Sequence, residues 1–423
     1  MSSRVSVVIF AQNYAPEPSG NAPYVTSLAE GLQASGEFDL TVVTAHPYYP
    51  DWQIRAGYGQ WKRDETLQGV RLRRRLHYVP RRPTALRRLV SELSFGVRSA
   101  FSSLGRPDVV VLVSPSMFAS AVTMLRLKLL NPGTPVLVWV QDLYSLGVRE
   151  TGGRAEVAKV VTAVESWLFR TAGTVTVIHE RFRHTVTSLL GVEADRVRII
   201  RNWTHISPVE GSRRAAARSK LSWGGDEIIA LHTGNMGVKQ GLENVVRAAE
   251  LAERRGDRVR FVFIGGGNQR DRLVDMAAGL TQIEFIGSLP DDEYALALTA
   301  ADVLLVNELP GVSGMAVPSK LTSYFAAGRP VVAATDAGGV TDEEVTASRA
   351  GVRVGAGDAR ALLDAVIEVG ADAERSSQMG LEGVRYYERL LSPEAAIDAF
   401  KQALRDVRRS GRSKRRRRAL RRS

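Results

Sequence analysis

The sequence predicts an α/β protein with two Rossmann-like domains, each built on a doubly wound parallel sheet. Three observations lead to this prediction. The chain has 423 residues, which is more than one hydrophobic core usually holds. Short apolar, β-branched runs alternate with helical stretches in both halves, and a polar segment separates the halves. A hydrophobic content of 44% with 24% charged residues is typical of a soluble globular protein.

In the first half, continuous apolar runs alternate with longer segments of helical character. Such runs indicate parallel strands that are covered on both faces. The strands are expected at 5–10, 40–44, 109–113, 136–140 and 174–178, and the clearest helices at 23–35, 86–104 and 156–170.

The second half repeats this alternation after the polar segment 202–225, which is rich in Ser, Arg and Gly and is the best linker candidate. Strands are expected at 228–232, 259–264, 283–286, 303–306 and 331–334, helices starting near 241, 269, 291 and 319, and final helices at 373–390 and 393–409. We therefore predict a first domain at 1–205, a linker at 206–225, a second domain at 226–390, a helix at 391–410 that could pack back on the first domain, and a disordered basic tail at 411–423.

Composition excludes several classes of site. The chain has no cysteine, so it holds no disulfide and no thiolate ligand, and a cytoplasmic location is expected. The first apolar run is too short for a signal peptide, and no run approaches the roughly 20 residues that span a bilayer. Only six histidines occur, without metal-ligand spacing, so no built-in metal is expected.

Positive charge is concentrated in two places. The tail 411–423 carries eight basic residues and no acidic one, which is two thirds of the net charge of +12. The segment 71–106 has ten arginines and a single acid, Glu92. Such patches favour anionic surfaces, although the tail has no aromatic residues for stacking on bases, which argues against specific nucleic-acid binding. A solvated tail without a partner is the other reading.

Within this basic segment, one predicted helix is amphipathic. Leu86, Leu89, Val90 and Leu93 share one helical face beside arginines. Such a helix could lie on an anionic membrane and reach a lipid-linked substrate, or it could be an ordinary buried helix with a solvated basic edge.

Two loops of the first domain follow strands and should lie at the carboxyl edge of its sheet, where open α/β sheets bind ligands. The loop 13–21 contains a single glycine, Gly20, and is either a plain turn or a ligand loop. In the second loop a strand ends on Gln141 and Asp142. Asp142 could cap the next segment or contact a substrate hydroxyl.

Three loops of the second domain could hold phosphate groups. The loop 232–241 has Gly234, Gly237 and Gly241 around Lys239, the loop 264–268 begins with Gly265 and Gly266, and the loop from Gly311 leads through Pro318 into a helix that starts near Lys320. Glycine loops before helices present free backbone N–H groups, and lysine adds a positive charge. Each loop alone could be an ordinary turn, but together they predict a nucleotide diphosphate ligand.

The motifs GNMGVKQGLENVV, FVFIGGGNQRDRL and AADVLLV…PSKLTSYFAAGRPVVAAT resemble those of the GT-B glycosyltransferases of family 4 (group 1). The resemblance covers nearly the whole chain. It is greatest to colanic-acid and O-antigen enzymes, including fucosamine-transferase-like members, on the segments 13–17, 140–144, 234–237 and 318–321. It implies two Rossmann-like domains that face each other across a cleft, and a retaining transfer from a nucleotide sugar.

The resemblance also assigns residues. Gly20 falls in the loop that approaches donor phosphates and acceptor, Lys239 or Gln240 at the phosphate-binding lysine, and 311–316 in the loop near the transferred sugar. The expected catalytic residues are Lys239, Lys320, Asp142 and Gln141, and the expected donor-binding residues are Gly20, Gly234, Asn235, Gln240, Gly265, Gly266, Met315, Ala316, Ser319, Leu321 and Ser323. The chain departs from the family pattern at four of these positions: Asn235 stands for a frequent arginine, Gln240 interrupts a Lys–Gly pair, Ser323 stands for the ribose-binding glutamate, and Gln141 stands for a sugar-contacting histidine.

The function expected from the resemblance is a retaining, metal-independent transfer of a hexosyl or aminosugar unit from a nucleotide-diphosphate sugar to a lipid-linked saccharide in surface polysaccharide biosynthesis. No cofactor beyond the donor is expected, and the location is cytoplasmic, peripheral on the inner face of the membrane. Two alternatives remain open: a sugar-nucleotide epimerase that uses Asp142, Glu180 or Glu308, and a non-catalytic protein that binds polyanions.

Overall fold

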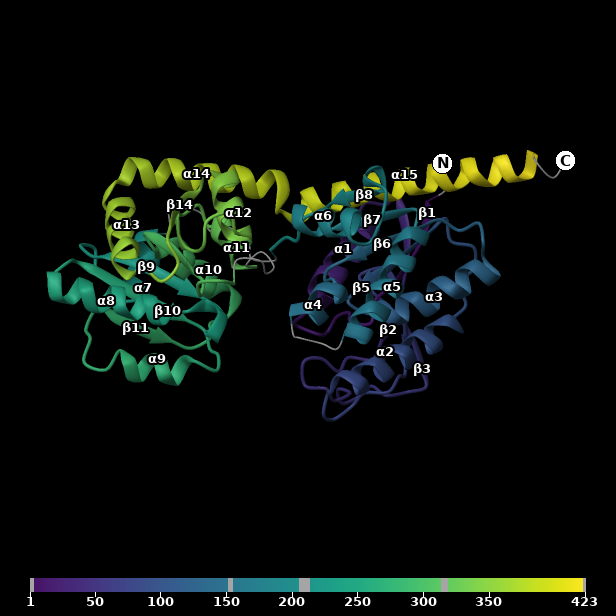
Figure 1. The fold of residues 1–423 in the computed structure, drawn as a ribbon, viewed down its shortest axis with the longest axis horizontal. Coiled ribbons are helices and arrows are strands. Elements are labelled where there is room, and N and C mark those ends of the chain that lie inside the picture. The colour runs from purple at the N-terminus through teal and green to yellow at the C-terminus, as the bar shows by residue number, and fades with distance from the viewer. Residues whose placement is uncertain (1–3, 151–154, 205–213, 313–318, 421–423) are drawn as a thin grey trace. The chain divides into compact units, whose positions relative to one another are not determined.

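The computed structural model describes residues 4–150, 155–204, 214–312 and 319–420, which form two compact units. The first unit comprises the described residues up to Asn202 and those from Pro393 onward, and the second comprises those from Trp203 to Ser392. Each unit is built around one sheet with helices on both faces (Figure 1). The prediction of two α/β domains with parallel sheets is confirmed.

The first sheet has eight strands in the order β3-β4-β2-β1-β5-β6-β7-β8, and only the edge strand β3 runs antiparallel. Its strands are β1 (Val5–Phe10), β2 (Phe38–Ala45), β3 (Lys62–Leu67), β4 (Val70–Arg75), β5 (Val109–Ser114), β6 (Val136–Val140), β7 (Thr174–Val177) and β8 (Val197–Ile199). The helices of this unit are α1 (Ala22–Ala34), α2 (Ala85–Ala100), α3 (Met117–Leu130), α4 (Tyr144–Glu150), α5 (Ala155–Thr171), α6 (Glu180–Ser188) and α15 (Pro393–Leu420).

The second sheet has six parallel strands in the order β11-β10-β9-β12-β13-β14. They are β9 (Ile228–Thr233), β10 (Val259–Ile264), β11 (Ile283–Ile286), β12 (Val303–Asn307), β13 (Val331–Ala334) and β14 (Gly351–Val354). The helices are α7 (Arg214–Lys220), α8 (Glu243–Arg255), α9 (Arg270–Met276), α10 (Asp291–Ala300), α11 (Lys320–Ala326), α12 (Val340–Ser348), α13 (Ala359–Ala371) and α14 (Ala373–Leu390).

Both sheets reverse their winding direction beside their first strand. Strand β1 pairs with β2 on one side and with β5 on the other, and β9 pairs in the same way with β10 and β12. The loops that leave the carboxyl ends of strands next to such a switch point diverge and leave a crevice for a ligand. The topology therefore directs attention to the loops after β1 and β5 in the first unit and after β9, β10 and β12 in the second. The loop after β6 lies one strand farther from the switch point.

The described part of the predicted linker is structured and belongs to the second unit. Residues 214–220 form α7, and Ala217 and Trp223 lie in the core that also contains β9 and α10. Arg218 anchors this segment through an ion pair of 2.9 Å with Asp302. The polar composition of the segment reflects a helix with a single buried face. The boundary between the two units falls at Asn202.

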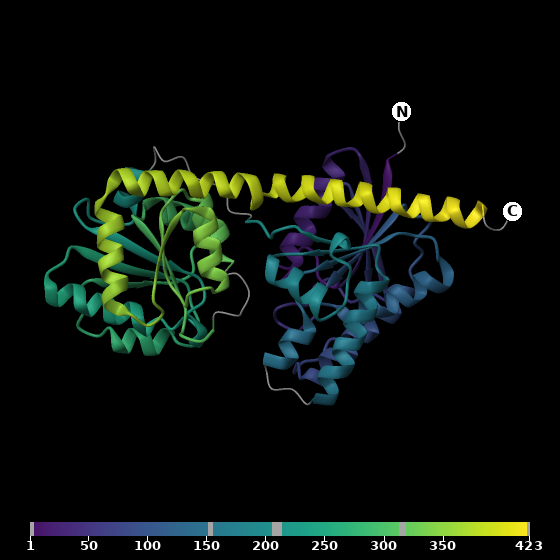
Figure 2. The ribbon, with the colours of Figure 1, turned by 45° about the horizontal axis from the view of Figure 1, so that its top comes forward.

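The long helix α15 packs on the first unit, as Figures 1 and 2 both show in yellow. Phe400 contacts Trp139 of β6 with ring centroids 4.8 Å apart, and Arg408 pairs with Asp108 at 2.9 Å. The helix continues to Leu420, so most of the segment 411–423, where the sequence predicts disorder, is helical in backbone. Among the described residues, no helix combines the length and the apolar character needed to cross a membrane.

Candidate functional site

The loops after β9 and β10 are joined by backbone hydrogen bonds at the carboxyl edge of the second sheet. The Gly234 N–H donates to the Ile264 carbonyl oxygen at 2.8 Å, and the Met236 N–H donates to the Gly266 carbonyl oxygen at 2.7 Å. A Cβ atom on Gly265 would lie 2.3 Å from the Gly234 carbonyl oxygen, and the backbone of Gly265 has φ +133°. These glycines therefore allow one loop to pack directly on the other, which fixes the backbone of both beside the switch point.

Lys320 reaches this pair of loops from the start of α11. Its Cε lies 4.0 Å from the position that a Cβ atom on Gly234 would occupy. Its Nζ lies 3.3 Å from Nε2 of His232, a side chain in β9 that is 0% exposed. Burial lowers the pKa of Lys320 to about 7, whereas Glu308 nearby acts in the opposite direction. The structure thus brings Gly234, Gly265 and Lys320 together, as the sequence predicts.

The remaining residues of the loop after β9 have different environments. Lys239 is exposed, and no hydrogen-bond partner of its ammonium group occurs among the described residues. The side chain of Gln240 is used locally, since its Oε1 accepts from Gly237 N–H at 3.0 Å. Asn235 is exposed. A free cation at Lys239 is available for a ligand, whereas Gln240 is engaged in shaping the turn.

Helix α11 presents its predicted donor-binding residues unequally. Ser319 is exposed, whereas Leu321 is 0% exposed and packs in the core of the unit. Ser323 is also buried, and its hydroxyl donates to the Lys320 carbonyl at 2.9 Å and lies 3.1 Å from the hydroxyl of Tyr294. The side chain of Leu321 therefore supports the helix rather than facing a ligand. Met315 and Ala316 lie outside the described residues.

In the first unit, the loop after β1 is held by a carboxylate that the sequence analysis did not single out. Glu17 is buried and accepts from the N–H groups of Tyr48 and Tyr49, at 2.8 Å each. Gly20 has φ +67°, and a Cβ atom there would lie 3.3 Å from the ring of Tyr49. Glu17 therefore joins the loops after β1 and β2, and Gly20 allows their close approach.

The two polar residues after β6 have separate partners. Gln141 Oε1 accepts from Asn202 Nδ2 at 2.8 Å. Asp142 is exposed and accepts from Leu143 N–H at 2.9 Å, while its carbonyl accepts from Ser114 at 3.1 Å. The carboxylate of Asp142 thus bonds the adjacent backbone N–H, one residue ahead of α4, and its role in capping or in contacting a substrate hydroxyl stays a prediction.

Two further carboxylates hold helix starts at this edge, and sequence reasoning missed both in this role. Glu165 of α5 is 0% exposed and accepts from the N–H groups of Tyr144 and Ser145 at the start of α4. Glu92 of α2 accepts from the hydroxyl of Tyr144 and from Phe118 N–H at 3.2 Å, at the start of α3. Glu92 thereby ties α2, α3 and α4 together. Burial raises the pKa of its carboxyl to about 7.

This raised pKa predicts a pH-dependent stability. The folded protein retains the Glu92 proton above the ordinary pKa of 4.5, so the contribution of this group to stability is full below pH 4.5 and is lost as the pH rises through 7. Between pH 5 and 8, the unfolding free energy of the wild type should fall by roughly 1–3 kcal/mol more than that of Glu92→Gln, measured by urea denaturation. Glu180→Gln, at an exposed site, is the control. Parallel pH curves for wild type and Glu92→Gln would contradict the prediction.

Two of the three carboxylates that an epimerase would need, those of Glu308 and Glu180, already bond other side chains of the protein. Glu308 accepts from Thr341 Oγ1 at 2.6 Å through one oxygen and from Thr335 Oγ1 through the other. Glu180 is exposed and pairs with Arg183 at 3.2 Å. Within the described part of the chain, no cluster of three His, Asp or Glu side chains could hold a metal ion.

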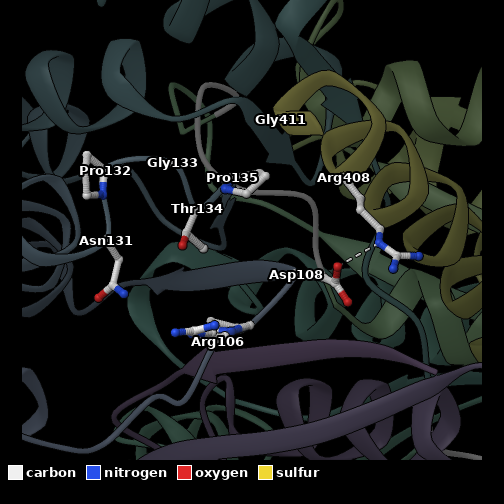
Figure 3. A pocket seen from close by; sticks show the side chains of 10 residues that line it. Arg106, Asp108, Asn131, Pro132, Gly133, Thr134, Pro135, Arg408 and Gly411 are labelled. Carbon is white, nitrogen blue, oxygen red and sulfur yellow. Dashed lines mark hydrogen bonds and ion pairs between the residues drawn. The ribbon is translucent and has the colours of Figure 1, made fainter. Parts of the chain in front are cut away.

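A cavity of about 340 Å³ in the first unit lies away from these loops. Figure 3 shows its lining between α15 and the segments that precede β5 and β6, including Arg106, Asp108, Asn131, Thr134 and Arg408. These segments enter the amino ends of their strands, whereas the candidate site lies at the carboxyl ends. The cavity is therefore separate from the candidate site.

Two family models match the chain. A "Glycosyl transferase 4-like domain" matches residues 19–203, and "Glycosyl transferases group 1" matches residues 227–372. The first match covers most of the first structural unit, without β1 and α15, and the second covers the part of the second unit that contains the loops converging on Lys320.

Individual proteins extend this similarity. The chain is 30% identical, over 79% of its length and 84% of the relative, to the protein assigned as colanic acid biosynthesis glycosyl transferase WcaI of Escherichia coli (strain K12). It is 33% identical, over 43% of its length and 48% of the relative, to 2-deoxystreptamine glucosyltransferase of Streptomyces kanamyceticus.

Solved structures show the same fold at low sequence identity. Sucrose-phosphate synthase from Thermosynechococcus elongatus matches with a TM-score of 0.73 at 20% identity, over 96% of this chain and 99% of that one. HepE from Anabaena, in complex with UDP, matches with a TM-score of 0.67 at 13% identity, over 95% and 100%. The two parallel-sheet units have the GT-B fold, and the chain belongs to the group 1 glycosyltransferase family.

Proposed function

We propose that this glycosyltransferase moves a sugar, with retention of configuration, from a nucleotide-diphosphate sugar to a lipid-linked saccharide in surface polysaccharide biosynthesis. The observation that carries the donor assignment is the convergence of the interlocked Gly234 and Gly265 loops with Lys320 at one switch point. Rigid backbone N–H groups beside a lysine suit a diphosphate. The relative WcaI is named for colanic acid biosynthesis, and HepE binds UDP, which supports the choice of donor class and pathway class.

In the proposed reaction, the main task of the protein is to stabilise the diphosphate leaving group. The acceptor oxygen forms a bond to the anomeric carbon on the face from which the diphosphate departs, the bond from carbon to phosphate oxygen breaks, and the acceptor proton passes to the diphosphate. Negative charge grows on that diphosphate in the transition state. Lys320 and the exposed Lys239 would stabilise it electrostatically, so that the transfer needs no metal ion.

The test is transfer and hydrolysis with a panel of UDP-, GDP-, ADP- and dTDP-sugars, with the anomeric configuration of the product read by NMR. Retained configuration and unchanged rates in a chelator would support the proposal. Product analysis without an acceptor separates it from epimerisation, which would change the sugar while leaving it on the nucleotide. Absence of binding and of turnover with every donor would overturn it.

The first unit carries a surface suited to a lipid-linked acceptor. The apolar residues Leu86, Val90, Leu93, Val97 and Phe101 are exposed at spacings of three and four residues along α2 and its end. Exposed arginines at 81, 82, 87 and 88 flank the start of this face. Two other arginines of the segment 71–106 do not contribute, since Arg74 and Arg75 are buried and paired with Glu65 and Asp64. We therefore narrow the proposed contact with an anionic membrane to residues 81–101.

This assignment predicts vesicle binding. The double variant Leu86→Asp/Phe101→Asp should bind phosphatidylglycerol-rich vesicles at least about tenfold more weakly than the wild type, because each large apolar side chain that enters the interface contributes roughly 1.5–3 kcal/mol. Co-sedimentation measures the effect. Leu381→Asp is a matched control, because Leu381 is 56% exposed on α14 of the other unit. Equal binding of wild type and double variant would exclude this face.

A further inference from the structure

We propose that His232 positions the ammonium group of Lys320 for the donor diphosphate, and that binding of a nucleotide diphosphate draws one proton from solvent onto Lys320. This inference rests on the donor site proposed above and adds a positioning residue and a proton linkage to it.

The contact between the two side chains is defined by the fold. His232 lies in the middle of the second sheet on β9, it is fully buried, and its ring packs against Phe263 with centroids 5.6 Å apart. Lys320 Nζ lies 3.3 Å from His232 Nε2. A strand residue packed in this way has little freedom, so its ring nitrogen can accept a hydrogen bond from the ammonium group at a fixed point. That point lies directly beside the Gly234 loop.

The charges around Lys320 leave its protonation sensitive to a ligand. His232 faces it from β9, and the Glu308 carboxylate, which follows β12, attracts its positive charge at longer range. Tyr324 on α11 accepts from Thr233 N–H at 2.9 Å, and burial raises the pKa of its phenol, so Tyr324 adds no negative charge here. The hydroxyl of Tyr294 on α10 lies 3.1 Å from that of Ser323. Within the described ranges, no carboxylate forms an ion pair with Lys320. Burial lowers the pKa of Lys320 to about 7 and that of His232 well below its ordinary value.

A bound diphosphate changes this balance. Its negative charge favours the ammonium form, so the pKa of Lys320 rises in the complex. Above pH 7 the free protein is mostly neutral at Lys320, and binding must then take up a proton. As far as Lys320 determines it, the affinity for the diphosphate should be nearly constant below pH 7, whereas protonation of the terminal phosphate weakens it below about pH 6. It should weaken by up to about tenfold per pH unit above pH 7, until the pKa of the complex is reached.

The experiment is calorimetric titration of the full chain with UDP, and then GDP, ADP and dTDP, at pH 8 in Tris and in HEPES. These buffers differ in ionisation enthalpy, so the difference in heat gives the number of protons taken up. The terminal phosphate, with a pKa near 6, is ionised at pH 8 and contributes little. The expected uptake by the wild type is about 0.9 proton, from a pKa near 7. Lys320→Met should bind more weakly with an uptake close to zero.

Two variants of the histidine test its positioning role. His232→Phe fills a similar volume without an acceptor and should weaken binding about tenfold, with a shifted pH midpoint, while His232→Asn should recover most of the affinity through its amide oxygen. Melting temperatures show whether each variant is folded. Binding without proton uptake, the same uptake in Lys320→Met, or a wild-type pH profile in folded His232→Phe would overturn the inference and leave the proposed function standing. Failure of every nucleotide to bind would overturn the proposed function, and the inference with it.

Discussion

Replacing Lys320 with methionine should lower kcat/KM for sugar transfer by about 10²–10³-fold, which is the usual cost of one fixed electrostatic donor at a developing anion. The loss should fall on kcat as well as on KM, because negative charge on the diphosphate increases as the bond to the sugar breaks. The neighbouring loops do not depend on the ammonium group, since their contacts are between backbone atoms. The folded structure should therefore survive, as near-UV circular dichroism can show.

The matched control for this prediction is Lys220→Met. Lys220 lies on α7 of the same unit, its side chain is 58% exposed, and its partner is Glu293 at 3.4 Å. An exposed ion pair of this kind contributes little, so the control should retain wild-type kinetics. Full activity in Lys320→Met would mean that the diphosphate is held elsewhere, with Lys239 the next candidate.

The sequence predicted the central strands well because buried parallel strands are nearly continuous apolar runs. The range expected at 259–264 is the observed β10, and that at 228–232 differs from β9 by one residue. It missed the β3–β4 pair, because β3 is a charged, largely exposed edge strand without an apolar pattern. The sequence analysis assigned 206–225 to a linker because this segment is polar, and α7 within it buries little more than Ala217.

At the candidate site, too, the sequence revealed local patterns but not the contacts that form between distant segments. The glycine loops could be found from the sequence, since a strand followed by glycines is a local pattern. The partners could not, because Lys320 and His232 are 88 residues apart, and Glu17 and Tyr48 are 31 residues apart. Nothing in the spacing of Glu92 or Glu165 indicates the helix starts that they hold, and those contacts arise only when separate elements pack.

Gly265→Ala should be among the most damaging single-methyl substitutions at the site. The new Cβ atom would lie 2.3 Å from the Gly234 carbonyl oxygen, a backbone atom that cannot rotate away, and the φ of +133° is one that alanine rarely adopts. We expect a loss of about 2–4 kcal/mol in unfolding free energy and at least tenfold weaker binding of a nucleotide diphosphate, because the Gly234 loop must move. Urea denaturation and calorimetric titration measure the two effects.

The next residue supplies the control. A Cβ atom on Gly266 meets nothing within 4 Å, and its φ lies outside the left-handed region, so Gly266→Ala should change stability by no more than about 0.5 kcal/mol. The two variants add the same methyl group one residue apart, and the difference between them measures the contact between the loops after β9 and β10 together with the backbone strain at Gly265. If Gly265→Ala kept full donor affinity, the diphosphate could not depend on the Gly234 backbone being fixed. The donor site would then have to be sought along α8 and Lys239 instead.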